Sequence, residues 1–301
     1  MTNQTTIDWP KKTREIRQYV IDSRRWNDFV FRDDDIVIST WAKSGTTLTQ
    51  QIVAQLIFDG ADLYGPNLSP WIDLQMNDEE IPRAIAQTHR RFLKTHLPLD
   101  TIVYCPRAKY IFIGRDGRDT FWSWYNHWSS NTPEDTAGIN SRNPDLPPIR
   151  PPNPDIRQAF LEWLDSGTTY PNWPFWDHMQ GWFDARKLPN LLLLHYADLR
   201  ADLASGIRRI AEFLQIPIDP LRFDAILEHC SMDYMRQKAD ADAPHFKTVF
   251  KDGAHSFFYK GTNGRWRDVL TAEDNARYQA EVAAHLTPDA ATWLETAQLP
   301  N

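Results

Sequence analysis

A lysine followed by small and hydroxyl-bearing residues stands where an apolar run gives way to helical spacing. Lys43, Ser44 and Gly45 come just after the apolar run 36–38. A lysine charge, hydroxyl donors and the first N–H groups of a helix are typical ligands of an oxyanion. The segment differs from Walker A, because Gly45 follows the lysine and residue 40 is threonine. It predicts a phosphate-type loop, with an ordinary helix N-cap as the alternative.

A lysine and a histidine two positions apart end a second apolar run. Lys94 and His96 close the segment 91–96, and residues two apart point to the same side of an extended chain. An imidazole takes up a proton near neutral pH. We therefore expect a cation and a base to face one cleft, and a structural histidine is the alternative.

Two more segments carry groups that suit a second anion. Arg115 follows the apolar run 110–113, and Ser123 comes eight residues later. An arginine together with a hydroxyl is a typical anion-binding pair. An ion pair between Arg115 and Asp119 is the alternative. Residues 259–267 combine two glycines with basic and aromatic residues. Glycines let backbone approach a ligand closely, although a surface turn would look the same.

Apolar runs and helical periods alternate along the chain and predict an α/β fold. The expected strands are 36–38, 91–94, 110–113 and 191–194, and helical spacing follows over 48–57, 203–214 and 272–284, the last after capping-box residues 271–274. Uninterrupted apolar strands between helices indicate a parallel sheet covered on both faces. We expect one three-layer domain over 1–301, with ligands at the carboxyl ends of the strands.

Composition excludes several other classes of protein. The 301 residues include 33 basic and 40 acidic side chains, a net charge of −7, which argues against a nucleic-acid partner. Apolar runs are too short to span a membrane, and the N-terminus lacks a signal core. Cys105 and Cys230 fit no metal spacing. We expect a cytoplasmic protein with reduced thiols, no membrane association and no metal.

Taken together, these segments resemble the cytosolic sulfotransferase family, which uses 3′-phosphoadenosine 5′-phosphosulfate (PAPS). The family's P-K-S-G-T-T-W loop is similar to residues 42–48, and its K-T-H-L-P segment is intact at 94–98. The arginine and serine of the family's 3′-phosphate segment match Arg115 and Ser123. The R-K-G-x-x-G-x-W-K motif resembles 259–267, and Y-E-D resembles 196–198. The motifs lie in the family's order from about residue 30 to 286.

The resemblance implies a role for each matched residue. It implies that His96 is the general base, that Lys43 stabilises the leaving oxygen, and that Lys94 contacts the sulfuryl group. The donor-binding set implied by the family, with PAP as the product and no metal, comprises Lys43, Ser44, Gly45, Thr46, Thr47, Leu48, Arg115, Ser123, Tyr196, Ser231, Met232, Tyr259, Lys260 and Gly261.

This chain departs from the family pattern at several positions. Leu48 replaces the tryptophan that stacks on adenine, Met232 replaces an aromatic residue, and Tyr259 replaces an arginine. These changes predict weaker or rearranged donor binding. The family's dimerisation motif is degraded over 267–276, so we expect a monomer or a weak homodimer.

Tryptophans indicate where an acceptor binds. We expect about half of them to be core and the rest to line a slot for a small aromatic or hydrophobic acceptor, which takes the sulfuryl group on a hydroxyl or an amine. The set is Trp122, Trp124, Trp128, Trp173, Trp176 and Trp182. The proline-rich stretch 129–155 predicts a long loop that serves as a substrate lid. A P-loop nucleotide kinase and a non-catalytic aromatic-rich binding module are the alternative functions.

Overall fold

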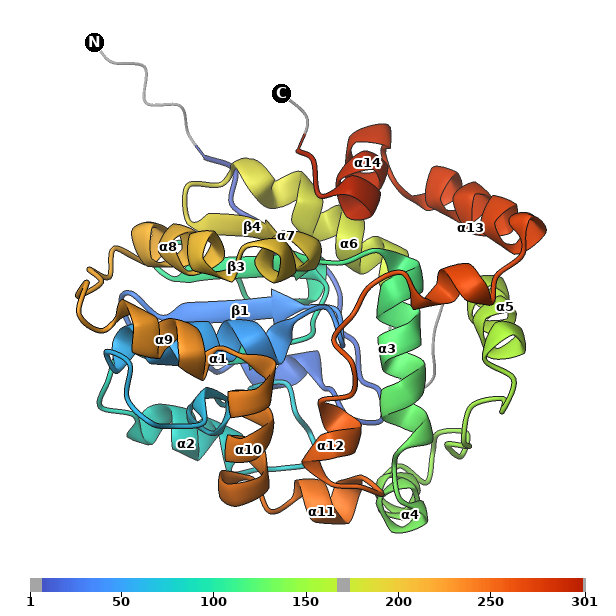
Figure 1. The fold of residues 1–301 in the computed structure, drawn as a ribbon, viewed down its shortest axis with the longest axis horizontal. Coiled ribbons are helices and arrows are strands. Elements are labelled where there is room, and N and C mark those ends of the chain that lie inside the picture. The colour runs from blue at the N-terminus through green and yellow to red at the C-terminus, as the bar shows by residue number, and fades with distance from the viewer. Residues whose placement is uncertain (1–6, 167–173, 300–301) are drawn as a thin grey trace.

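Four parallel strands form the central sheet of the computed structural model, which describes residues 7–166 and 174–299. Their order is β2-β1-β3-β4, and each coincides with a predicted apolar run; the strands are β1 (Ile36–Thr40), β2 (Phe92–Thr95), β3 (Lys109–Gly114) and β4 (Leu191–His195). In Figure 1 the visible arrows point toward α3, so their carboxyl ends share one edge of the sheet.

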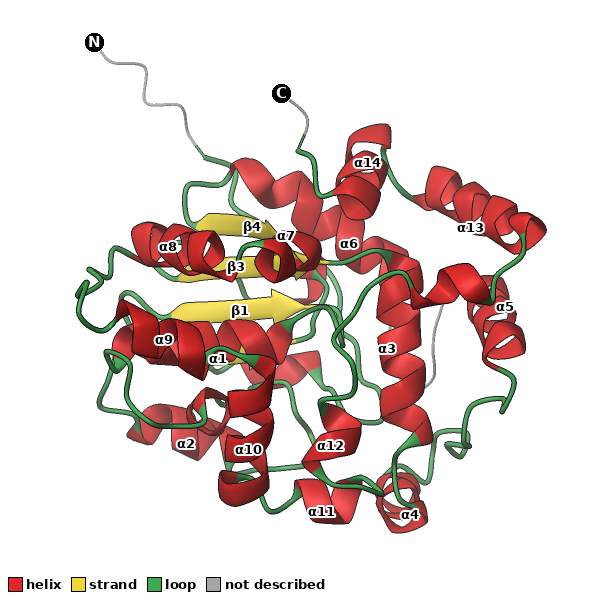
Figure 2. Ribbon diagram, viewed as in Figure 1, coloured by secondary structure: helices red, strands yellow, loops and turns green. Residues whose placement is uncertain are grey.

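Alternate residues of each strand pack into separate cores on the two faces of the sheet. Val37, Leu93 and Phe112 belong to one core, whereas Ile38 and Ile111 belong to the other. Strand side chains alternate between faces, so a sheet that is buried on both sides requires continuous apolar runs. The three-layer α/β arrangement is visible in Figure 2 and confirms the predicted fold class.

The helices divide between the two cores. Those whose buried side chains join the core of Val37 are α2 (Glu80–Ala86), α3 (Gly117–Ser129), α4 (Pro133–Arg142), α5 (Ile156–Ser166), α6 (Phe175–Asp184), α13 (Ala272–His285) and α14 (Pro288–Thr296). Those that join the core of Ile38 are α1 (Thr46–Ile57), α7 (Tyr196–Ala201), α8 (Leu203–Leu214), α9 (Phe223–His229), α10 (Met232–Asp242), α11 (Phe246–Val249) and α12 (Ala254–Phe257).

Short 3₁₀ turns join several of these elements. They are η1 (Ser23–Trp26), η2 (Gly65–Leu68), η3 (Leu99–Thr101), η4 (Ala185–Lys187) and η5 (Arg265–Asp268). The capping box predicted before α13 is present, because Thr271 and Asp274 bond reciprocally to each other's backbone N–H. Within the described ranges, no helix has both the length and the apolar character needed to cross a bilayer.

The prediction of an unbroken loop over 129–155 is wrong, because α4 lies inside it. Thr132 caps this helix by accepting the Asp135 N–H at 3.2 Å. Pro133 occupies the first helical position, where a missing N–H does no harm. The remaining stretch 143–155 is irregular, and aromatic side chains of α3 hold it: Tyr125 Oη donates to Asn153 O at 2.9 Å.

Candidate active site

The loop between β1 and α1 has the conformation of an anion cradle. Lys43 and Gly45 have φ angles of 68° and 119°, and such positive values are uncommon outside glycine. A methyl group on Gly45 would lie 2.9 Å from Tyr196 Cδ2, so only glycine fits there. Gly45 itself is the N-cap of α1, and no side chain caps the helix. The alternative of an ordinary helix N-cap, in which a side chain such as Ser44 or Thr46 would cap the helix, is therefore wrong.

Ser44 carries a buried hydroxyl that no group satisfies. Its Oγ has no hydrogen-bond partner among the described residues, and its side chain is fully buried. Thr46 Oγ1, in contrast, lies 2.6 Å from Thr40 Oγ1. Because an unsatisfied buried hydroxyl costs free energy, the Ser44 position suits a ligand that supplies the missing partner.

Lys43 extends from this loop into a site that other cations share. Its Nζ lies 3.3 Å from His127 Nδ1 and 4.2 Å from the centre of the Phe257 ring. Burial, then the charges of Lys94 and Arg115, lower the pKa of Lys43 to about 7. The strongest charges acting on Lys43 are thus both positive, an arrangement that an anionic ligand would stabilise.

His96 is held in one tautomer by the end of β1. Its Nδ1 lies 2.7 Å from the backbone oxygen of Thr40 and 3.3 Å from Thr40 Oγ1. Since a carbonyl oxygen only accepts, Nδ1 carries the proton and Nε2 is the basic nitrogen. Burial, with the Lys94 charge as the next cause, holds the pKa of His96 well below its usual value. The ring is therefore neutral at neutral pH.

Lys94 rests on the indole of Trp71. The chain at Trp71 forms a parallel bridge with Lys94 at the open edge of β2, and Lys94 Nζ lies 3.7 Å from the indole ring centre. The same indole packs nearly perpendicular to the His96 imidazole, with ring centroids 5.0 Å apart. Burial lowers the pKa of Lys94 to about 8, an effect that Asp73 and then Glu80 oppose.

Asp73 is a buried carboxylate beneath these groups. It accepts hydrogen bonds from Trp71 Nε1 at 2.7 Å, from Trp26 Nε1 at 3.2 Å and from the His96 N–H at 3.2 Å. Burial raises the pKa of Asp73, and its hydrogen-bond donors act in the opposite direction. One carboxylate therefore fixes both the indole that supports Lys94 and the backbone of His96.

Arg115 joins the first loop to the late glycine segment. Its guanidinium donates to Lys43 O at 2.9 Å and to Asn263 Oδ1 at 2.8 and 3.1 Å. Asp119 accepts the Gly264 N–H at 2.6 Å instead of bonding Arg115, so the predicted alternative of an Arg115–Asp119 ion pair does not describe this site.

Tyr196 connects the same segments from α7. The Arg115 guanidinium lies 4.3 Å from its ring centre, and its Oη donates to Gly261 O at 3.3 Å. Gly261 also packs against Met232. Four predicted residues from distant parts of the chain, Arg115, Tyr196, Met232 and Gly261, thus meet beside the Lys43 loop.

Other predicted residues lie further from this cluster or serve the fold. Ser123 is half-buried on α3, Thr47 is half-buried at the start of α1, and Leu48 packs in the core. Ser231 caps α10 by accepting the Tyr234 N–H at 3.2 Å. Tyr259 and Lys260 are exposed, with Lys260 Nζ 5.3 Å from the Tyr259 ring centre.

The sequence patterns did not single out several residues of this cluster: Thr40, Trp71, Asp73, His127 and Asn263. His127 had a usable signal, because it stands one helical turn after Ser123. Trp71 and Asp73 lie in an irregular stretch and had none.

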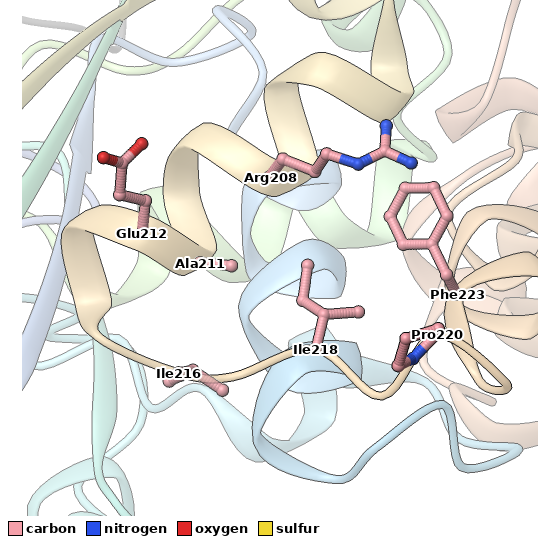
Figure 3. A pocket seen from close by; sticks show the side chains of 7 residues that line it. All are labelled: Arg208, Ala211, Glu212, Ile216, Ile218, Pro220 and Phe223. Carbon is pink, nitrogen blue, oxygen red and sulfur yellow. The ribbon is translucent and has the colours of Figure 1, made fainter.

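Two cavities of about 410 Å³ contain none of the predicted catalytic or donor-binding residues, although the second includes two of the tryptophans proposed for the acceptor slot. One lies between α8 and α9 (Figure 3), where the rim includes Arg208 and Phe223. The other is lined by Phe121, Trp124 and Trp128 with the proline-rich stretch. Of the tryptophans proposed for the acceptor slot, those in the described residues are all buried, and Trp173 lies outside the described residues.

Comparison with known proteins decides the class of this site. A family model described as a sulfotransferase domain matches residues 33–287. The chain belongs to the sulfotransferase family. This sulfotransferase is 34% identical to a glycolipid sulfotransferase of Mycobacterium tuberculosis, over 92% of both chains. It is 26% identical to sulfotransferase 2A1 of Macaca fascicularis, over 81% of both. The predicted family and enzyme class are therefore confirmed, against the kinase and binding-module alternatives.

Solved structures share the fold of this sulfotransferase. The mouse sulfotransferase SULT7A1 complexed with PAP superposes with a TM-score of 0.69 at 22% identity, covering 90% of this chain and 92% of the other. Retinol dehydratase in complex with androsterone and PAP gives the same TM-score at 20% identity, covering 93% and 89%. The likeness extends over nearly the whole fold.

Proposed function

We propose that this sulfotransferase moves the sulfuryl group of PAPS to a hydroxyl of a hydrophobic acceptor, with His96 as the general base. The hydrogen bond from His96 Nδ1 to the Thr40 carbonyl carries the assignment. It leaves Nε2 basic, and Trp71 places the ammonium of Lys94 beside the same ring. A neutral imidazole next to cations suits removal of a proton while negative charge develops nearby.

The β1–α1 loop suits the phosphosulfate end of the donor. Ser44 offers an unsatisfied buried hydroxyl, Lys43 offers a charge, and Gly45 leaves room for close approach. Relatives of the same fold are complexed with PAP. When bound, PAPS supplies a sulfuryl group on a phosphate leaving group.

The site residues then have separate tasks. His96 Nε2 takes the proton of the acceptor hydroxyl as its oxygen bonds to sulfur. Lys43 balances the charge on the phosphate oxygen released when the S–O bond breaks, and Lys94 balances charge on the sulfuryl oxygens. Interactions that strengthen as charge develops are the ones that accelerate the chemical step.

We assign the 3′-phosphate to Arg115, Ser123 and Lys260, and the adenosine to the surface around Tyr196 and Met232. Arg115 is already fixed by Asn263 and by the Lys43 carbonyl, and this preorganisation favours binding. Lys260 is exposed, so its contribution requires the segment 259–261 to close on the donor.

The acceptor side of the site is bounded by aromatic rings. The ammonium groups of Lys94 and Lys43 lie over the rings of Trp71 and Phe257. Aromatic surfaces of this kind bind apolar alcohols well. The relative from M. tuberculosis is named for glycolipid sulfation. We therefore propose a glycolipid or another hydrophobic alcohol as the acceptor.

Transfer of labelled sulfate from PAPS to a panel of glycolipids, phenols and alkyl alcohols tests the proposal. Wild-type protein should label at least one acceptor. His96→Ala should fold normally, keep its affinity for PAP and lose turnover by roughly 10²- to 10⁴-fold or more. Full turnover by His96→Ala would remove His96 from the mechanism, and no transfer by wild type to any acceptor would contradict the proposed substrate class.

A further inference from the structure

A second imidazole lies beside the phosphosulfate loop. His127 extends from α3, and its Nδ1 is 3.3 Å from Lys43 Nζ. The ring is held by aromatic contacts on another side, with centroids 4.9 Å from Phe250 and 5.7 Å from Phe257. Its place is thus set by packing, independently of the lysine. The motifs assign His127 no role.

We propose that His127 is a positioning residue for Lys43: its Nδ1 accepts a hydrogen bond from the Lys43 ammonium and aims that charge into the donor site. The inference rests on the proposed function, since it gives a partner to the lysine that faces the leaving group. An ammonium has three donors, so one bond to His127 leaves two for the donor's oxygens.

Charge near Lys43 makes such an acceptor necessary. The charged groups that act on it most strongly are Lys94 from β2 and Arg115 after β3, and both repel it. Phe257 from α12 presents a ring to the ammonium. The charge that His96 would carry if protonated also lowers the pKa of His127. His127 therefore supplies a polar contact to the ammonium of a half-buried lysine whose strongest charged neighbours are cations.

His127 can accept because it stays neutral. Burial, followed by the charges of Lys43 and Lys94, holds the pKa of His127 well below its usual value. With its proton on Nε2, the ring presents a lone pair from Nδ1 to the lysine. A protonated ring would repel Lys43, so the contact requires the neutral form.

The backbone keeps α3 and the segment before α12 together around this contact. Thr132 N donates to Val249 O at 2.9 Å, and Lys251 N donates to Ser130 O at 2.9 Å. Asn131 and Phe250 form an antiparallel bridge. His127 from α3 and Phe257 from α12, which follows this segment, both contact the Lys43 ammonium.

Asparagine and glutamine variants at position 127 separate the proposed role from packing. The amide oxygen of an asparagine side chain at this position would occupy the place of Nδ1, whereas a glutamine side chain places its amide near the position of Nε2. We expect His127→Gln and His127→Phe to lower the pKa of Lys43 by about one unit, because an ammonium loses its acceptor. His127→Asn should keep that pKa near the wild-type value.

Two measurements report the result. Titration of Lys43 by NMR in the unliganded protein, with ¹³C-labelled lysines, reads its pKa without any reaction. Turnover then gives the pH profile of kcat/KM for PAPS, which should fall about tenfold in His127→Gln and His127→Phe, with its alkaline limb moved to lower pH. Activity of His127→Asn should approach wild type.

Each outcome decides the matter. If the Lys43 pKa is the same in wild type, His127→Asn and His127→Gln, the proposal is wrong, whether or not activity falls. Should His127→Phe fail to fold, the comparison of the asparagine variant with the glutamine variant still gives the answer. A wild-type protein that shows the expected Lys43 titrations but transfers nothing from PAPS would contradict the proposed function and leave the contact established.

Discussion

The ammonium of Lys94 lies 3.7 Å above the indole ring of Trp71, and that ring is fixed by a 2.7 Å hydrogen bond from its Nε1 to Asp73. Asp73 also accepts the backbone N–H of His96. The cation and the proposed base therefore share one support, which the irregular stretch before α2 supplies. A displacement of Trp71 would disturb both groups together.

Trp71→Leu should lower kcat/KM about tenfold, because a desolvated cation–π contact contributes up to about 2 kcal/mol. Trp71→Phe keeps a ring under Lys94 and loses only the bond to Asp73, so it should retain more activity than the leucine variant. Steady-state kinetics with PAPS and a labelled acceptor provide the measurement. Equal activities in the two variants would show that the ring face contributes nothing to the Lys94 position.

The pH dependence of kcat/KM near neutral pH should reflect the titration of Lys43 and Lys94 and not that of His96. The pKa values of Lys43 and Lys94 are lowered to about 7 and about 8, and the ammonium forms are the active ones. As pH rises through these values the charges disappear, so kcat/KM for PAPS should fall above about pH 7. His96 has a pKa well below its usual value, so the basic ring persists to acidic pH and the acidic limb lies low.

Two comparisons check this prediction. The profile of kcat reports the complex, in which the donor's negative charges raise the lysine pKa values, so its alkaline limb should lie at higher pH than that of kcat/KM. Lys43→Arg should flatten the limb that belongs to Lys43, since a guanidinium stays charged. An alkaline limb that is identical in kcat and kcat/KM, and unchanged in Lys43→Arg, would assign the titration to another group.

The sheet and the motifs at its carboxyl edge follow from local signals. Continuous apolar runs such as 191–194 suit only strands buried on both faces, and the capping pair Thr271 and Asp274 marks the start of α13. The proline count over 129–155 concealed α4, because Pro133 is compatible with a helix at its first position. Composition alone does not distinguish that position from a helix interior.

The supporting side chains of the site depend on long-range pairing. Trp71 reaches Lys94 because residues 70–72 bond to the free edge of β2, and no local pattern specifies that pairing. The role of Asp73 becomes evident only in the folded structure, where its hydrogen-bond donors surround the carboxylate. His127 is intermediate, since the helical period relates it to Ser123 but gives no sign of its contact with Lys43.

A substitution at Gly261 tests the contact between the late glycine segment and Tyr196, whose ring lies against Arg115. Its φ is 62°, a methyl group there would overlap the terminal methyl of Met232, and its carbonyl accepts the Tyr196 hydroxyl. Gly261→Ala should destabilise the protein by about 1–2 kcal/mol and weaken PAP binding, because the segment must move away from Tyr196. Calorimetric titration with PAP and denaturant unfolding measure the two effects.

Gly138 provides the matched control, since a methyl group there meets nothing within 4 Å. It lies in α4, so Gly138→Ala should stabilise the protein by about 0.5–1 kcal/mol and leave PAP affinity unchanged. Met232→Ala combined with Gly261→Ala removes the overlap but keeps the positive φ, so its PAP affinity should lie closer to that of Met232→Ala alone than the affinity of Gly261→Ala lies to wild type. If Gly261→Ala binds PAP as tightly as wild type, the segment at 261 does not contact the donor and the adenosine side of the site must lie elsewhere.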